Sequence, residues 1–93
     1  MPYIITSVTV EKNYKLRLIY SNGGVVVVDF TPIIRQGGVF DKLGDRDFFS
    51  QVKLDEGGRY IEWSGGLDFC ADALWFEAHP NDNLLNLSAA NSM

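Results

Sequence analysis

The sequence is poor in the residues that build disulfides, metal centres and thiol chemistry. It contains one cysteine, Cys70, and one histidine, His79, among 93 residues. A single cysteine excludes an internal disulfide, and one histidine without a cysteine pair makes no zinc site. A cysteine nucleophile needs a base, and on a helix His79 would lie about two and a half turns away from Cys70. We therefore expect no metal, no cofactor and no cysteine-based enzyme.

Positive charge and long apolar runs are also scarce. Eight lysine and arginine residues stand against twelve aspartate and glutamate residues, which gives a net charge of −4. Binding to duplex nucleic acid depends on cations that neutralise phosphates. The segment with Lys15 and Arg17 is the only candidate for a basic face. We therefore expect no direct nucleic-acid contact. Apolar runs such as residues 25–28 fall far short of the ~20 residues of a membrane span. Because the first residues also show no signal-peptide pattern, we expect a soluble cytoplasmic protein without membrane contact.

A large apolar content in a short chain is what the sequence does have. Hydrophobic residues make up 46% of the chain and aromatic residues 13%, which is enough for a core without disulfides. The length fits a single domain, which we expect over residues 1–79. Residues 80–93, PNDNLLNLSAANSM, lack aromatic residues, so we expect a flexible polar tail there.

The first third predicts a three-stranded antiparallel meander. Residues 3–11 are rich in β-branched residues, with polar and apolar positions that alternate from Thr6 to Glu11, and residues 14–20 alternate with the period of a strand. The cluster at residues 21–24, SNGG, favours a tight hairpin turn of the primed type. The strand expected from Val25 to Phe30 opens with four consecutive valines, an apolar run that is typical of a strand covered on both faces, or of a central strand, and not of a solvent-facing edge.

The rest of the chain predicts short helical turns, a second hairpin and a C-terminal helix. Thr31 and Pro32 form a helix-start signal, but the glycine pair at residues 37–38 allows only short helical turns before residue 51. Period-two patterns on both sides of the glycines at residues 57–58 indicate a hairpin. A helical period follows from about residue 71 to residue 78, before a proline. The sequence therefore predicts a small, mainly antiparallel α+β domain.

Both tryptophans lie between residues 57 and 76. The strand period directs Ile61 and Trp63 into the core, and the helical period lays Leu74 and Trp75 against the sheet. The stretch is therefore mainly architectural, although Trp63 and Trp75 stay candidates for contact with a ligand or partner, because aromatic residues are enriched at interaction sites.

Two aspartates, Asp29 and Asp68, follow or flank turn-forming residues. Each could accept hydrogen bonds from the backbone N–H groups of the next turn, which is the ordinary role of a cap. If the two carboxylates met in a cleft, they could instead hold a ligand or act as a general acid and base. The sequence alone does not place them together, so both interpretations stay open.

Three segments together resemble a bacterial family known as domain of unknown function 2442. They are LRLIYSNGGVVVVDFTPII, GGVFDKLGDRDFF and IEWSGGLDFCADALW. Ser64 and Ala71 depart from the family pattern, which commonly has proline at both places; Asp68 or Asp72 would then carry more of the interaction with the helix N-terminus. The residues at matching positions are Asp29, Pro32, Gly38, Phe40, Leu43, Asp45, Phe49, Ile61, Trp63, Gly66, Asp68, Leu74 and Trp75.

The resemblance implies a small α+β fold and says little about chemistry. Members look like free-standing small proteins, or like the N-terminal part of DNA-binding regulators. They also resemble one half of a two-protein cassette of toxin–antitoxin type. We therefore expect a non-enzymatic interaction module that pairs with another small protein or with itself. The alternative is a ligand or enzymatic site built on Asp29 and Asp68.

Overall fold

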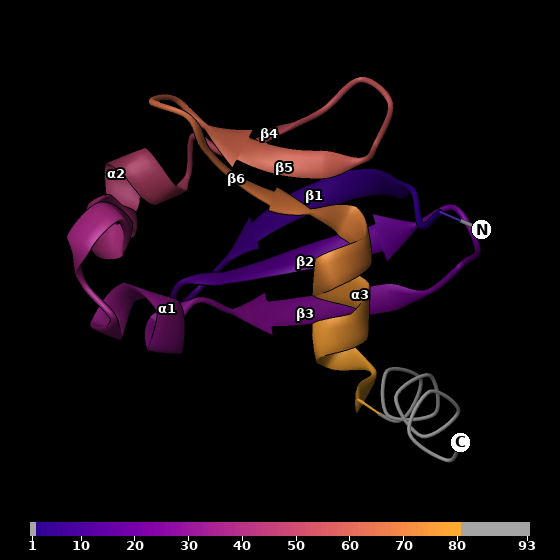
Figure 1. Ribbon diagram of the computed structural model, residues 1–93, viewed down its shortest axis with the longest axis horizontal. Coiled ribbons are helices and arrows are strands. Elements are labelled where there is room, and N and C mark those ends of the chain that lie inside the picture. Colours follow the sequence, from indigo (N-terminus) through magenta and orange to yellow (C-terminus); the bar gives the residue numbers. More distant parts are fainter. Residues whose placement is uncertain (1, 81–93) are drawn as a thin grey trace, which may run out of the picture.

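The computed structural model describes residues 2–80 and has the predicted α+β architecture, with two three-stranded antiparallel sheets (Figure 1). The strands are β1 (Ile5–Glu11), β2 (Lys15–Tyr20), β3 (Val25–Asp29), β4 (Lys53–Leu54), β5 (Tyr60–Trp63) and β6 (Leu67–Cys70). The helices are α1 (Thr31–Arg35), the 3-10 helix η1 (Gly38–Gly44), α2 (Arg46–Phe49) and α3 (Ala71–Ala78). The tail expected over residues 80–93 lies, apart from Pro80, outside the described residues.

The first sheet is the predicted meander, with the strand order β1-β2-β3. Its inner face packs against α3 and the second sheet (Figure 1). Leu16, Leu18 and Tyr20 alternate along β2 and are all buried, as the period of two requires. Tyr14, predicted as the first residue of this strand, instead lies in the preceding turn with φ of 60°.

The run of four valines in β3 does not behave as predicted. Because β3 is the last strand of the meander, it is an edge strand and not a central one. Val26 is buried at 2% exposure, whereas Val25 and Val27 on the opposite face are 52% and 48% exposed. The prediction of a strand covered on both faces was wrong, because an apolar run carries no information about which face finds a cover.

The turn between β2 and β3 also differs from the predicted primed type. Of its residues only Gly23 has a positive φ, 87°, and its N–H donates to the carbonyl of Tyr20 at 2.9 Å. A primed turn of the Asn-Gly kind needs positive φ at both central residues, and Asn22 does not have it. Gly24 is required for another reason: a Cβ there would approach the ring of Trp75 to 2.5 Å.

The second sheet contains the predicted hairpin and one additional strand. β4 and β5 pair as expected, and β6 pairs antiparallel to β5 on its other side. Residues 67–70 alternate half-buried and exposed positions, a four-residue period-two signal that is too short to separate from the start of the following helix. That helix, α3, begins at Ala71 as predicted, but its N-cap Cys70 makes no side-chain capping bond, and Asp68 lies in β6.

The middle third forms the predicted short helical turns, and they close one end of the core (Figure 1). Asp45 caps α2, because its carboxylate accepts the N–H groups of Asp47 and Phe48 at 2.9 and 3.4 Å. This cap places Phe49 in the core at 2% exposure. The ring of Phe49 meets Phe30 and Trp63 at centroid distances of 5.6 and 5.9 Å, so the short helices and both sheets share one aromatic core.

Candidate functional site

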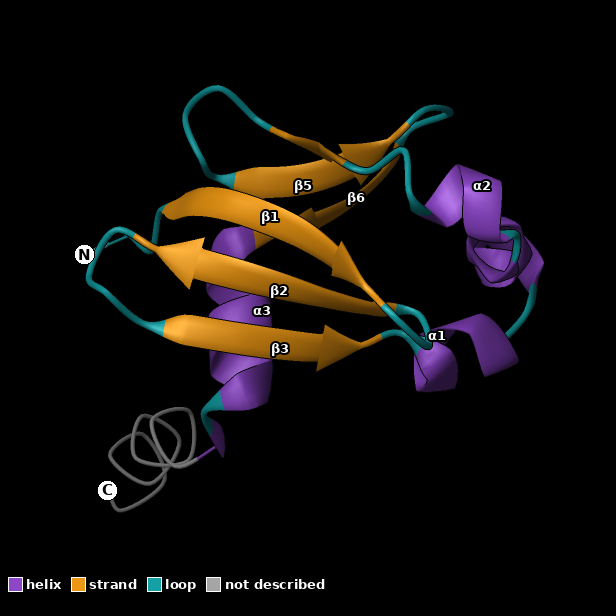
Figure 2. Ribbon diagram, turned by 180° about the vertical axis from the view of Figure 1, so that it is seen from behind, coloured by secondary structure: helices purple, strands orange, loops and turns teal. Residues whose placement is uncertain are grey.

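No helix or strand formed by residues 2–80 covers the outer face of the first sheet. Figure 2 shows β1, β2 and β3 in front of α3, which covers only the opposite face. We define the outer face by the residues that the register places side by side on the uncovered side of the three strands: Ser7, Thr9, Glu11, Lys15, Arg17, Ile19, Val25, Val27 and Asp29.

An apolar patch occupies the β3 side of this outer face. Ile19 stands directly opposite Val25, and Val27 follows two residues later on the same face. Their exposures are 37%, 52% and 48%. These three branched residues are contiguous on a strand pair and remain exposed to solvent. Folding of the chain therefore does not account for their apolar character.

One edge of β3, the edge that faces away from β2, has no paired strand among residues 2–80. Tyr20 donates its N–H to Gly24 at 2.8 Å, and Phe30 donates its N–H to Tyr14 at 2.9 Å. Because hydrogen-bonded pairs alternate in an antiparallel ladder, these bonds direct the even-numbered residues of β3 toward β2. The N–H and C=O groups of Val25 and Val27 therefore point to the open edge. Among residues 2–80, no strand pairs with that edge.

Charged side chains border the apolar patch. Lys15 stands opposite Asp29, and the guanidinium of Arg17 pairs with Glu11 at 2.9 Å. The carboxylate of Asp29 accepts the backbone N–H of Thr31 at 2.9 Å. This bond first, and then the Thr31 hydroxyl, hold the pKa of Asp29 below its ordinary value, with a further contribution from Lys15. Asp29 thus connects the end of β3 to the start of α1, as a cap does.

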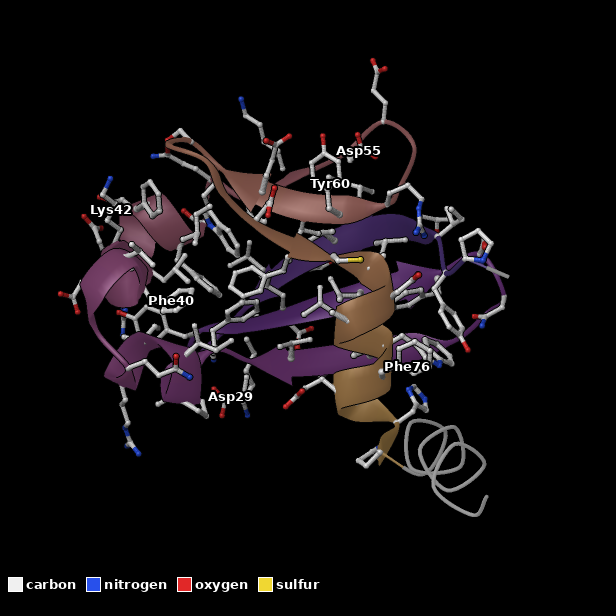
Figure 3. All side chains as sticks on the ribbon, in the orientation of Figure 1. Asp29, Phe40, Lys42, Asp55, Tyr60 and Phe76 are labelled. Carbon is white, nitrogen blue, oxygen red and sulfur yellow. The ribbon has the colours of Figure 1, made fainter. Side chains whose placement is uncertain are left out.

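Asp29 and Asp68 belong to different sheets. Figure 3 shows Asp29 at the end of β3, on the other side of the molecule from Tyr60 and Asp55. Asp68 lies on β6 opposite Glu62 of β5. No hydrogen bond or ion pair connects Asp29 with Asp68 in the part of the chain that the structure describes, residues 2–80. Their joint use in a ligand or catalytic site stays a prediction.

Asp68 lies instead beside Glu62 on the second sheet, and Lys53 of β4 stands on the other side of Glu62. The pKa of the Tyr60 hydroxyl is raised, first by the negative charge of Asp55, then by Glu62, and to a smaller extent by Asp68. Within residues 2–80, no group of three or more histidine, cysteine, aspartate or glutamate side chains is arranged to hold a metal ion.

The two tryptophans have different surroundings. Trp63 is 1% exposed, and its Nε1–H donates to the carbonyl of Phe49 at 2.9 Å. Trp75 is 9% exposed and is stacked between the rings of Tyr3 and His79, at centroid distances of 4.6 and 3.9 Å. Its buried Nε1 has no hydrogen-bond partner among residues 2–80. Both indoles are therefore core residues, and contact of either with a ligand stays a prediction.

A network of polar bonds ties the start of the chain to α3. Asp72 accepts the N–H of Tyr3 at 2.9 Å and pairs with Arg59 at 3.1 Å. The hydrogen bond from Arg59 and then the one from Tyr3 lower the pKa of Asp72. Tyr20 donates its hydroxyl to the carbonyl of Ala71 at 2.9 Å, and burial raises the pKa of this phenol. This network serves the fold and lies on the covered side of the first sheet.

The chain is similar to one protein family and to one solved structure. The model of a family described as protein of unknown function, DUF2442, matches residues 5–80. A search of the curated proteins found no match. The solved structure of NE0471 from Nitrosomonas europaea ATCC 19718 has a TM-score of 0.72 and 26% sequence identity over 87% of this chain. The chain spans 52% of that protein, which carries a provisional description as a DNA-binding protein. No helix formed by residues 2–80 is both long and apolar enough to cross a membrane.

Proposed function

This chain belongs to the DUF2442 family, and we propose that it is a non-enzymatic interaction module that binds a strand of a partner protein along the free edge of β3. The observation that carries this proposal is the coincidence of two unsatisfied features at the same residues. Val25 and Val27 expose about half of their surface, and their backbone groups point to the open edge.

Strand addition would satisfy both features together. An extended segment laid antiparallel to β3 would pair with the N–H and C=O groups of Val25 and Val27. Alternate apolar side chains of that segment would lie beside the valines on the outer face, since side chains in a sheet alternate between faces. Without a partner, a flat apolar edge is a liability for aggregation. Among residues 2–80, the one charged residue of this edge is Asp29, at the end of β3.

The partner is either a second copy of this chain or another small protein, such as the other member of a toxin–antitoxin-like gene pair. Antiparallel pairing of two copies about Val27 places Val27 opposite its equivalent and Asp29 opposite Val25. This register keeps the two Asp29 carboxylates apart, so a homodimer is compatible with the charges of the edge. A foreign strand needs only the same alternation of apolar side chains.

Co-expression with the product of the neighbouring gene, followed by size-exclusion chromatography with light scattering, tests the proposal. We expect a complex of the two proteins or a dimer of this chain at micromolar concentration. Separate elution of two monomers would contradict the proposal. The variant Val27→Pro removes an N–H that the β2–β3 ladder does not use, so it should abolish the association while the circular dichroism spectrum is retained.

A second candidate function is a regulatory one, and the comparison with NE0471 favours it. That protein is about twice as long as the region it shares with this chain, and it carries the provisional DNA-binding description. We propose that the shared domain regulates a DNA-binding protein, or forms a pair with one, and does not contact DNA itself. Of the two cations on the outer face, Arg17 is already paired with Glu11. Binding of this chain alone to duplex DNA at about 50 mM salt, with a steep salt dependence, would contradict this arrangement.

A further inference from the structure

A hollow of ≈ 480 Å³ lies between the turn that joins β1 to β2 and the helix α2. Its volume is in the range of about 300–1,000 Å³ that small-molecule sites occupy. It lies at the β1 side of the first sheet, whereas the free edge proposed for strand binding is that of β3. The two surfaces are therefore separate.

The floor of the hollow is apolar and belongs to the core side of the sheet. Val10 pairs with Leu16 on the inner face, yet Val10 is 39% exposed while Leu16 is fully buried. Phe49 and Tyr14 line the hollow beside Val10, and their rings meet edge to face at 5.4 Å. An inward-facing valine that residues 2–80 leave 39% exposed is the clearest sign that the core is incomplete here.

The turn that forms one wall has a backbone conformation that L-residues rarely adopt. Asn13 and Tyr14 have φ values of 63° and 60°. Two hydrogen bonds hold Tyr14 in place: its hydroxyl donates to the carbonyl of Gly44 at 2.6 Å, and its carbonyl accepts the N–H of Phe30 at 2.9 Å. The wall is thus fixed before any ligand arrives.

The rim carries both signs of charge in equal number. Glu11 and Lys12 come from the turn, and Arg46 and Asp47 come from α2. Glu11 is already bound to Arg17, and neither Lys12 nor Arg46 is in an ion pair within residues 2–80. A simple anion would face the carboxylate of Asp47, and a simple cation would face Lys12 and Arg46. A ligand with both charges avoids each of these conflicts.

We propose that this hollow binds a small apolar α-amino acid in its zwitterionic form. The apolar side chain of the ligand covers Val10 and Phe49. The ligand carboxylate faces Lys12 and Arg46, and its ammonium group faces Asp47. This proposal does not depend on the partner strand at β3.

A titration with three probes that share one phenyl ring tests the proposal. The probes are L-phenylalanine, 3-phenylpropionate, which lacks the ammonium group, and phenethylamine, which lacks the carboxylate. Monitored by amide chemical shifts of the full chain, L-phenylalanine should bind saturably with a Kd of about 1 mM or tighter. Each analogue should bind about tenfold more weakly or worse, since it leaves one charge on the rim without a partner. Equal affinity for the three probes, or no saturable binding of L-phenylalanine, would overturn the proposal.

Matched variants locate the binding. Lys12→Met should weaken L-phenylalanine binding about tenfold, whereas Lys53→Met, an exposed lysine of β4 outside the hollow, should leave it unchanged. Shifted amide signals should centre on residues 10–14 and 46–50. Shifts that appear elsewhere, or an equal loss of affinity in both variants, would contradict the assignment. Val27→Pro should leave the affinity unchanged, so a failure of this proposal is distinguishable from a failure of the strand-binding proposal.

Discussion

The two faces of the first sheet are built from the same kinds of residue and have opposite surroundings. On the inner face, Leu18 and Val26 stand opposite each other with exposures of 0% and 2%. On the outer face, Ile19 and Val25 stand opposite each other with exposures of 37% and 52%. The inner pair is explained by folding, because α3 and the second sheet cover it. Folding does not explain the outer pair, which stays exposed. This difference suggests that the outer pair is covered when the protein binds a partner.

The largest effect should follow from a truncation on the inner face. Leu18→Ala should lower the free energy of unfolding by about 2–5 kcal/mol, because it leaves a cavity in a fully buried site. Val27→Ala on the outer face should change it by about 0.5 kcal/mol or less. Urea denaturation of the monomer measures both. Similar losses for the two variants would mean that the outer face is covered in solution by some part of the chain itself.

A smaller loss of stability should follow from removing the hydrogen bond that ties the β1–β2 turn to the 3-10 helix η1. Tyr14→Phe keeps the ring against Phe49 but removes the hydroxyl that donates to the carbonyl of Gly44. The expected loss is about 1 kcal/mol, which lowers the melting temperature by about 4–8 °C for a chain of this size. An unchanged melting temperature would show that this bond does not hold the turn to the helices.

The fold was largely predictable from the sequence because its signals are local and periodic. The alternation in β2, the hairpin around the glycines at residues 57–58 and the helix from Ala71 to Ala78 each depend on residues close in sequence. The strand β6 was missed because four residues that lead directly into a helix carry too little periodicity.

The candidate site was less predictable, because exposure depends on the neighbours of a strand. The four valines of residues 25–28 indicate a strand but do not reveal that only alternate valines find a cover. One available signal was the meander itself, since a third strand followed by a helix start has no strand on its far side. The hollow beside α2 had no signal at all, because residues 10–14 and 46–50 come together only through the fold.

The pH dependence of stability should distinguish the ion pair on the inner side, Arg59–Asp72, from the ion pair on the outer face, Arg17–Glu11. The pKa of Asp72 is lowered in the folded protein by Arg59 and Tyr3. This group therefore contributes stability above its unfolded pKa of about 3.9, and the contribution is lost as the pH falls through the lower folded pKa. Both partners are more than one third exposed, so solvent screening limits the contribution to about 0.5–1 kcal/mol.

The variant Asp72→Asn should therefore destabilise the protein at pH 7 and make less difference below about pH 3. Glu11→Gln, which breaks the ion pair with Arg17 on the outer face, serves as the matched comparison and should cost about 0.5 kcal/mol or less. Urea unfolding at several pH values measures both variants. An equal pH dependence of the two would contradict the distinction between a fold-supporting pair and a surface pair.

The smallest effect on stability should come from the outer face itself. The double variant Val25→Thr and Val27→Thr keeps the β-branched shape that strands favour and removes two exposed methyl groups. Its free energy of unfolding as a monomer should stay within about 0.5 kcal/mol of the wild type. Its association should nevertheless weaken at least tenfold, measured by sedimentation velocity. Unchanged association would leave the apolar patch without a function and restrict the interaction to the backbone edge.

The most direct test of the central claim compares proline at two adjacent positions of β3. The N–H of Val26 belongs to the ladder with β2, and the N–H of Val27 points to the open edge, so Val26→Pro should unfold the domain and Val27→Pro should leave it folded. Light scattering of the folded variant, alone and with the neighbouring gene product, is the deciding measurement. Strand binding at β3 predicts that the wild-type chain forms a dimer or complex and that Val27→Pro stays monomeric. Undiminished association of a folded Val27→Pro variant would contradict it.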